Sequence, residues 1–253
     1  MAHVQQLKFI NLVNEYFVNP IRNRSNPIRI LEIGSYILNG SPRDFLEIEN
    51  TEYVGVDLCA GKGVDVVSFG HKLDLGTATF DFVLSCECFE HDPHWIETFK
   101  NMYRMAKVGS IVAFTCASKG RLEHGTTRTN PDHSPGTQHL GIDYYKNLTE
   151  NDFYNAFDIN NLFQVHFFFF EKTSHDLYFV GIKTENYTLN LNREAFVLEV
   201  MRIKKLAKFR PKLYEVPVYF ARYLLPEQVF QNFAASYLKA VKPINKIFRT
   251  LKR

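Results

Sequence analysis

Two carboxylates and an imidazole lie close together in the stretch ECFEHDPHW, residues 87–95, directly after the apolar run FDFVLS. Glu87, Glu90 and His91 would share one face if a helical turn begins there. Such a group can bind a divalent cation, take part in proton transfer, or begin a capped helix. As ligands the three side chains suit Mg²⁺ or Mn²⁺ and leave positions open for a substrate diol, whose hydroxyl pKa the cation would lower.

The same residues also have a less specific interpretation. Glu90 can cap a short helix and His91 can be satisfied by a backbone group, with no ligand involved. Without a metal, His91 and His124 are the preferred general bases, because an imidazole with a pKa of about 6.5 can accept a proton from a hydroxyl. His124 belongs to the polar stretch 119–143, which is long for a connection and is expected to bind the acceptor.

The surrounding pattern predicts the elements that position these residues. Apolar runs predict strands over 28–34, 52–58, 64–68, 79–86 and 109–117, and helical spacing predicts helices over 4–18, 42–50 and 93–106. Two more strands, 163–172 and 176–184, flank a tight turn and predict an antiparallel hairpin. The alternation predicts an α/β fold: a Rossmann-like, seven-stranded, mostly parallel sheet that ends in this hairpin.

Ligands of such a sheet bind beyond the carboxyl ends of the strands, so the residues that follow each strand are candidates for binding. Gly34 follows the first strand and permits close backbone approach, and Gly40 can adopt a positive φ. Asp57 ends the second strand, where a carboxylate can accept hydrogen bonds from both hydroxyls of a ribose. Because the loop lacks the GxGxxG spacing, the pattern favours a nucleoside without phosphates over NAD.

From Ile28 to about Phe153 the sequence resembles the class I S-adenosylmethionine-dependent methyltransferases. The resemblance lies in four ordered stretches: ILEIGSYILNGSPRDFL, YVGVDLCAGKGVDVV, FDFVLSCECFEHDPHWIETFKNMYRMAKVGSIVAFTCAS and RLEHGTTRTNPDHSPGT. It implies that S-adenosyl-L-methionine is the cofactor. The implied cofactor-binding residues are Glu32, Gly34, Ser35, Tyr36, Gly40, Asp57, Leu58, His71 and Cys86.

The resemblance also implies roles within this set. Glu32 and Gly34–Tyr36 approach the methionine end, Asp57 binds the ribose and Leu58 packs near the adenine. The Cys86 backbone and Glu87, an implied catalytic residue, lie under the sulfonium. The family usually has Asp-Ala before the position of His71, whereas this chain has Phe69-Gly70, so the adenine contact passes to a backbone group or to His71.

The ExxEH spacing is similar to the metal site of two methyltransferase groups, those acting on 2′-hydroxyls at the 3′ end of RNA and the catechol type of the ubiquinone pathway. This implies a metal site made of Glu87, Glu90 and His91. His139 is the implied fourth ligand, because it precedes a helix much as a later histidine does in the RNA enzymes. His124 and His133 compete with it for that position.

The composition is that of an ordinary globular protein, with 45% apolar and 23% charged residues among 253. No apolar stretch is long enough to span a bilayer, and the N-terminal stretch does not resemble a signal peptide. The spacing of the four cysteines fits neither a disulfide framework nor a zinc knuckle, so reduced thiols in the cytoplasm are expected. We expect a methyltransferase domain over 1–185, with an N-terminal helical cap at 1–27, and a basic helical extension over 186–253.

Charge is distributed unevenly along the chain. Residues 201–253 hold 13 Lys and Arg but 2 Asp and Glu, whereas residues 1–200 hold 17 and 25. The basic helices can pack on the domain or on a second subunit, dock peripherally on an anionic membrane, or bind RNA phosphates. No stretch resembles an RNA-recognition motif, which disfavours nucleic acid as the partner.

The sequence therefore predicts an S-adenosylmethionine-dependent O-methyltransferase, metal-assisted, in the cytoplasm or at the periphery of a membrane. We expect a sugar hydroxyl of a glycan or glycoconjugate as acceptor, because a vicinal diol can chelate a metal and because the acceptor stretch is polar. RNA 2′-hydroxyls and small phenols are the alternative acceptors. A non-catalytic scaffold subunit with the same fold is the alternative of another class, although such a subunit would need neither Asp57 nor the ExxEH group.

Overall fold

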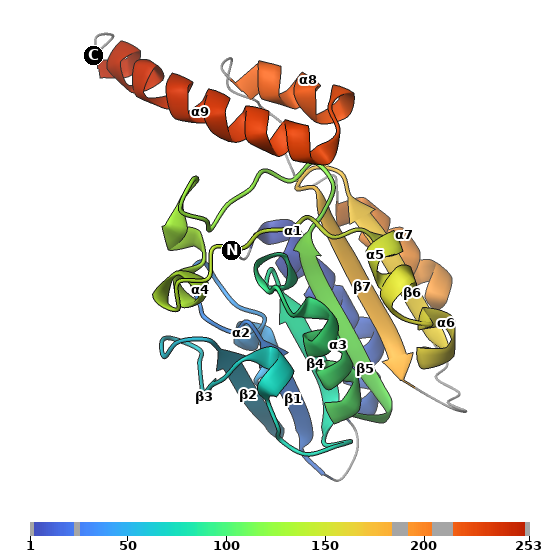
Figure 1. The fold of residues 1–253 in the computed structure, drawn as a ribbon. Helices are drawn as coiled ribbons and strands as arrows, with labels where there is room; N and C mark the ends of the chain where they lie inside the picture. The colour runs from blue at the N-terminus through green and yellow to red at the C-terminus, as the bar shows by residue number, and fades with distance from the viewer. Residues whose placement is uncertain (1–2, 23–25, 184–191, 204–214, 251–253) are drawn as a thin grey trace.

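Seven strands form a single sheet in the order β3-β2-β1-β4-β5-β7-β6 (Figure 1). The computed structural model describes residues 3–22, 26–183, 192–203 and 215–250, the last nine by their backbone alone. The strands are β1 (Ile28–Ile33), β2 (Thr51–Asp57), β3 (Val66–Val67), β4 (Phe80–Cys86), β5 (Ala106–Ala117), β6 (Val165–Glu171) and β7 (Asp176–Lys183). Strand β7 pairs antiparallel with β5 and β6, and all other pairs are parallel. The predicted Rossmann-like sheet with its antiparallel C-terminal hairpin is confirmed.

Helices cover both faces of this sheet (Figure 1). The α-helices of the described chain are α1 (Val4–Val13), α2 (Arg43–Leu46), α3 (Trp95–Met105), α4 (Pro135–His139), α5 (Glu150–Ala156), α6 (Ile159–Leu162), α7 (Arg193–Ile203), α8 (Val216–Leu224) and α9 (Glu227–Thr250). Helices α1 and α7 pack on one face, and α3, α5 and α6 pack on the other. The described part of the chain contains no helix long and apolar enough to cross a membrane.

Aromatic side chains join the layers on each face. On the first face Phe9 of α1 stacks on Tyr178 of β7 at 4.7 Å, and Phe196 of α7 meets Phe17 at 4.9 Å. Helix α7 therefore belongs to the core of the sheet domain, although its sequence falls in the predicted extension over 186–253. Only α8 and α9 form a separate apolar cluster, which packs against Leu122.

Of two predicted helices, the first keeps its predicted bounds but changes type within them, and the second is shorter than the periodicity indicated. The helix predicted over 4–18 continues past Val13 as a π-helical turn, Asn14–Val18, because its apolar positions remain buried. The helix predicted over 42–50 ends at Leu46, where the backbone of Glu47 leaves the helical region with ψ of 81°. Neither difference changes which strands carry the candidate binding residues.

Helices α8 and α9 lie across the carboxyl ends of the strands, above the stretch 118–147 (Figure 1). Glu227 of α9 accepts hydrogen bonds from the Gly120 amide at 3.1 Å and from the Asn147 side chain at 2.6 Å. Gln231, one turn later, donates to the Arg121 carbonyl at 2.6 Å. The C-terminal helices are thus bound to the same loop that the sequence predicts to receive the acceptor.

Candidate active site

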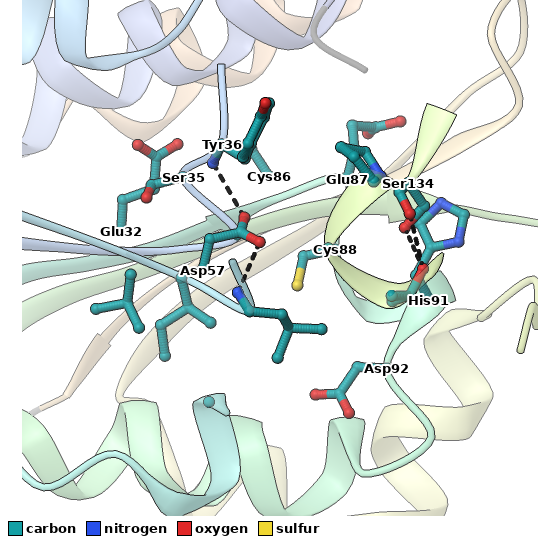
Figure 2. A pocket seen from close by; sticks show the side chains of 18 of the residues that line it. Glu32, Ser35, Tyr36, Asp57, Cys86, Glu87, Cys88, His91, Asp92 and Ser134 are labelled. Carbon is teal, nitrogen blue, oxygen red and sulfur yellow. Dashed lines mark hydrogen bonds between the residues drawn. The ribbon is translucent and has the colours of Figure 1, made fainter. Parts of the chain in front are cut away.

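The carboxyl ends of β1, β2 and β4 open into one cavity (Figure 2). Gln6 of α1 borders the cavity, as do residues 133–137, which include the start of α4. In Figure 2 Asp57 and His91 flank the cavity, with the thiol of Cys88 between them. The polar stretch 119–143 therefore reaches the cavity through its second half.

The turn after β1 requires a glycine. Gly34 has a φ of +86°, and a Cβ at this position would lie 2.7 Å from the Cβ of Cys88. The amides of Gly34 and Ser35 both donate to the Val56 carbonyl, at 2.8 and 3.1 Å. The turn is therefore held against the end of β2 and brings backbone to the edge of the cavity.

Asp57 binds this turn with its carboxylate. Its Oδ2 accepts a hydrogen bond from the Tyr36 amide at 3.0 Å, and its Oδ1 accepts one from the Leu58 amide at 2.7 Å. Burial raises the pKa of Asp57, and the amides of Tyr36, Leu58 and Cys59 oppose that rise. A Cβ on Gly136 would lie 2.7 Å from Oδ1, so α4 approaches the carboxylate through a position without a side chain. The three amides do not use all the lone pairs of the carboxylate, so it can still accept a hydrogen bond from a ligand hydroxyl.

Glu32 lies buried at the end of β1 and borders the same cavity. The Tyr53 hydroxyl donates a hydrogen bond to its Oε2 at 2.7 Å. Burial raises the pKa of Glu32 to about 7, although the bond from Tyr53 acts in the opposite direction. The carboxyl group can therefore carry charge near neutral pH, and an ammonium group in the cavity would stabilise that charge.

The sequence predicted that the residues of the ExxEH motif would share one helical face if a helical turn begins at Glu87. They do not. Glu87 directly follows β4 with a φ of +53°, in the left-handed region, and its amide donates to the Thr115 carbonyl at 2.8 Å. The helical turn that follows is 3₁₀ and covers only Phe89–His91. Because Glu87 lies outside that turn, its side chain and that of Glu90 enter different clusters.

The first cluster joins Glu87 to His3, Arg121 and Asp176. Asp176 lies 2.7 Å from His3 Nε2 and 3.4 Å from Arg121 Nη1, and Glu87 Oε2 lies 3.9 and 4.0 Å from the same two side chains. Burial and the charge of Asp176 raise the pKa of Glu87. Glu87 borders the cavity, and neither of its oxygens accepts a hydrogen bond from the described residues, so it is available to a ligand.

The second cluster consists of Glu90, His91 and His124, all buried, with ligand atoms within 4.8 Å of one another. Neither oxygen of Glu90 nor Nε2 of His124 has a hydrogen-bond partner in the described chain. Burial lowers the pKa of His91 to about 3 and holds the pKa of His124 well below its usual range. Burial and the charge of Glu87 raise the pKa of Glu90 to about 8. At neutral pH the cluster thus presents two neutral imidazoles and a largely protonated carboxyl.

No family model and no curated protein matches this sequence. Solved structures match it in fold. The CurJ carbon methyltransferase, in a selenomethionine-substituted crystal structure, is 13% identical with a TM-score of 0.50, over 70% of this chain and 54% of its own. The chain has the class I methyltransferase fold.

Two further structures are similar at lower scores. Phosphoethanolamine N-methyltransferase 2 of Haemonchus contortus is 14% identical with a TM-score of 0.48, over 70% of this chain and 52% of its own. The 1,6-didemethyltoxoflavin N1-methyltransferase of Burkholderia thailandensis is 15% identical with a TM-score of 0.48, over 71% and 80%. The chain thus spans about half the length of the CurJ and Haemonchus chains.

The methyltransferase fold gathers most of the predicted cofactor residues around the cavity. Those that border it are Glu32, Gly34, Ser35, Tyr36, Gly40, Asp57, Leu58 and Cys86. His71 does not: its ring lies 4.2 Å from that of His94, and Phe69 and Gly70 border the cavity instead. A Cβ at Gly70 would lie 2.6 Å from Thr98, so glycine lets this segment pack on α3.

The structure also redistributes the predicted metal ligands. His139 is exposed at the end of α4 and belongs to neither cluster, and His124 joins Glu90 and His91 in its place. The ring of Tyr145 packs 5.4 Å from that of His91 and 5.1 Å from that of His124. His91 is also a weaker base than predicted, because burial lowers its pKa to about 3 from the ordinary value of 6.5.

Sequence reasoning missed His3 and Asp176. His3 precedes the first helix, and Asp176 begins the last strand. His3 reaches the cluster because α1 packs on the sheet, and Asp176 reaches it because β7 pairs with β5. The one available signal was the position of Asp176 opposite Ala117, at the carboxyl end of β5.

Proposed function

We propose that this chain is an S-adenosylmethionine-dependent O-methyltransferase that acts on a sugar hydroxyl with the help of a divalent cation. The observation that supports it most is a single cavity, bordered at once by the Asp57 carboxylate, the Gly34 turn and the Glu87 carboxylate, which accepts no hydrogen bond from the described residues. One end of this cavity suits a nucleoside, and the other suits a hydroxyl-bearing acceptor.

The cofactor end fits S-adenosylmethionine by its donor set. Asp57 can accept ribose hydroxyl hydrogen bonds, Phe69 offers an apolar surface for the base, and Glu32 can bind the ammonium of the methionine part. When bound, this cofactor supplies a methyl group that is already activated on a sulfonium. The protein residues then have to orient the acceptor and exclude water, which is a modest catalytic demand.

The second cluster fits a divalent cation. Glu90, His91 and His124 are buried, close together and short of hydrogen-bond partners, which is costly without a ligand. One carboxylate with two imidazoles favours Mn²⁺ or Zn²⁺ over Mg²⁺, which prefers oxygen ligands. A cation there would supply positive charge that lowers the pKa of a nearby acceptor hydroxyl.

The remaining residues would orient the acceptor. Glu87 borders the cavity and can accept a hydrogen bond from a sugar hydroxyl. Arg121 and Asp176 are committed to their mutual contact at 3.4 Å and to holding Glu87 in place. Carboxylates and imidazoles around the acceptor end favour a polyhydroxyl substrate over a planar phenol.

Isothermal titration with S-adenosylhomocysteine tests the cofactor site. Asp57→Ala removes the ribose acceptor and the anchor of the Tyr36 amide, so we expect affinity to fall by about ten- to a hundredfold. Asp74→Asn is the matched control, since Asp74 is an exposed carboxylate paired with Arg104. Absence of binding to the wild-type chain would refute the methyltransferase assignment and favour a scaffold.

Calorimetric titration of the dialysed chain with Mn²⁺ and Zn²⁺ tests the cation site independently of activity. We expect binding by the wild-type chain, loss of binding in His124→Ala, and no change in His139→Ala, the exposed histidine. If the wild-type chain binds neither metal and transfers methyl groups fully in EDTA, the cation has no part in the reaction.

The acceptor class is tested by transfer of labelled methyl from S-adenosylmethionine to free sugars, an RNA oligonucleotide and a catechol. We expect the wild-type chain to transfer label to a sugar. The Glu87→Gln variant should transfer less label while it still binds S-adenosylhomocysteine. Label on RNA or catechol alone would replace the sugar by that acceptor.

A further inference from the structure

The α8–α9 hairpin, residues 216–250, has one face that is fixed to the protein. Val218, Ala221, Phe230 and Ala234 are buried together against the loop that carries Leu122. The hydrogen bonds of Glu227 and Gln231 to that loop hold the hairpin in one orientation. Its opposite face therefore has a defined direction with respect to the cavity.

That opposite face is apolar. Phe220, Tyr223 and Leu224 are 58%, 63% and 78% exposed, and their spacing puts them on one side of α8. Val229, at the start of α9, is 50% exposed. We call Phe220, Tyr223 and Leu224 the outer face of α8. Single exposed apolar side chains are common on protein surfaces, but a group of large ones usually marks an interaction surface.

The sequence of the segment that carries this face is rich in positive charge. Residues 201–253 hold 13 Lys and Arg and only 2 Asp and Glu. One of the two acids, Glu227, is turned toward Gly120 and Asn147 and offsets little of the charge outside. Five of the basic residues, between Lys204 and Lys212, directly precede α8 in sequence.

The combination of apolar anchors and net positive charge favours one occupant. A second copy of the chain would bring a surface of the same charge and repel it. RNA would neutralise the charge and could stack bases on Phe220 and Tyr223, but it would leave Leu224, the most exposed side chain of this face at 78%, and Val229 without an apolar partner. An anionic bilayer satisfies both features, because acidic headgroups attract the cations and the interface accepts the apolar side chains.

We propose that the outer face of α8 docks peripherally on an anionic lipid surface. Because the hairpin lies over the carboxyl ends of the strands, docking brings the cavity close to the membrane (Figure 1). A ligand of the cavity would then be met at the bilayer surface. This inference does not depend on the proposed methyl transfer.

Vesicle flotation of the full chain tests it. The wild-type chain is expected to float with vesicles of phosphatidylcholine and phosphatidylserine, to float poorly with phosphatidylcholine alone, and to be released by high salt. The double variant Phe220→Ser/Leu224→Ser should bind the anionic vesicles at least about tenfold more weakly. Val108→Ser is the matched control, because Val108 is 67% exposed near the start of β5, and it should bind like the wild type.

Unchanged thermal unfolding of the double variant would show that its fold is intact. The proposal fails if the wild-type chain does not float with anionic vesicles, or if the double variant floats equally well. It also fails if an RNA oligonucleotide binds the chain while vesicles do not, or if the double variant turns a lipid-free dimer into a monomer.

Discussion

His3 Nε2 lies 2.7 Å from Asp176 Oδ2, so the first residue before α1 contacts the first residue of β7. The other ring nitrogen of His3 accepts a hydrogen bond from the Gln6 amide at 3.4 Å and caps the helix. Gln6 borders the cavity. One side chain therefore fixes the N-terminal helix over the strand ends and places a charge partner beside Glu87.

Substitution of His3 separates these two contributions. His3→Ala removes both the cap and the contact with Asp176, and we expect the free energy of unfolding to fall by about 1–2 kcal/mol. His3→Asn retains a good capping side chain and should recover part of the loss. Urea unfolding measures both. Equal destabilisation by the two variants would show that the cap contributes nothing.

Glu32 should make stability depend on pH. Its folded pKa of about 7 lies above the ordinary value of 4.5, so between these pH values the folded chain holds a proton that the unfolded chain has lost. Stability should therefore fall as pH rises through this window, by about 3 kcal/mol from this group. Glu32→Gln keeps an acceptor for Tyr53 and should remove that part of the slope. Unfolding at about pH 5 and about pH 8 checks it, and an unchanged slope in the variant would contradict it.

Gly136 should be required for the close approach of α4 to Asp57. An alanine there would place its Cβ 2.7 Å from Asp57 Oδ1 and 3.2 Å from Leu58 Cβ, so α4 has to move away. We expect Gly136→Ala to weaken S-adenosylhomocysteine binding by about tenfold with little loss of stability. Gly141→Ala is the control, because a Cβ at Gly141 meets nothing within 4 Å, although its φ of +69° adds backbone strain. Equal affinities of the wild type and Gly136→Ala would mean that α4 does not help to form the binding site.

Arg121 should stabilise the fold through charge balance. It lies 3.4 Å from Asp176 and 4.0 Å from Glu87, and without it two buried carboxylates face each other. Arg121→Gln is expected to cost about 3 kcal/mol or more. Arg202→Gln, which breaks the exposed pair with Glu199, should cost less than about 1 kcal/mol. Similar losses in the two variants, measured by chemical unfolding, would show that the Arg121 cluster is screened by solvent.

The sequence by itself determined the sheet and the positions at its edge. Alternating apolar runs and helices specify the strands, and the carboxyl ends of parallel strands necessarily meet at one edge. Gly34 and Asp57 could therefore be placed together from local pattern, and the structure brings both to the cavity. The backbone conformation that Gly34 adopts is likewise a property of the residue type.

Only the tertiary structure decided which side chains meet around the acceptor. Glu87 and Glu90 are three positions apart, but the left-handed backbone of Glu87 sends them to different clusters. His124 rather than His139 joins Glu90, and His3 and Asp176 come from segments that are far apart in the sequence. Such contacts depend on how distant elements pack and on where loops are anchored, and no local periodicity encodes either. The same packing buries the imidazoles and thereby changes their proton affinity, so the chemistry of the site follows from the assembled fold.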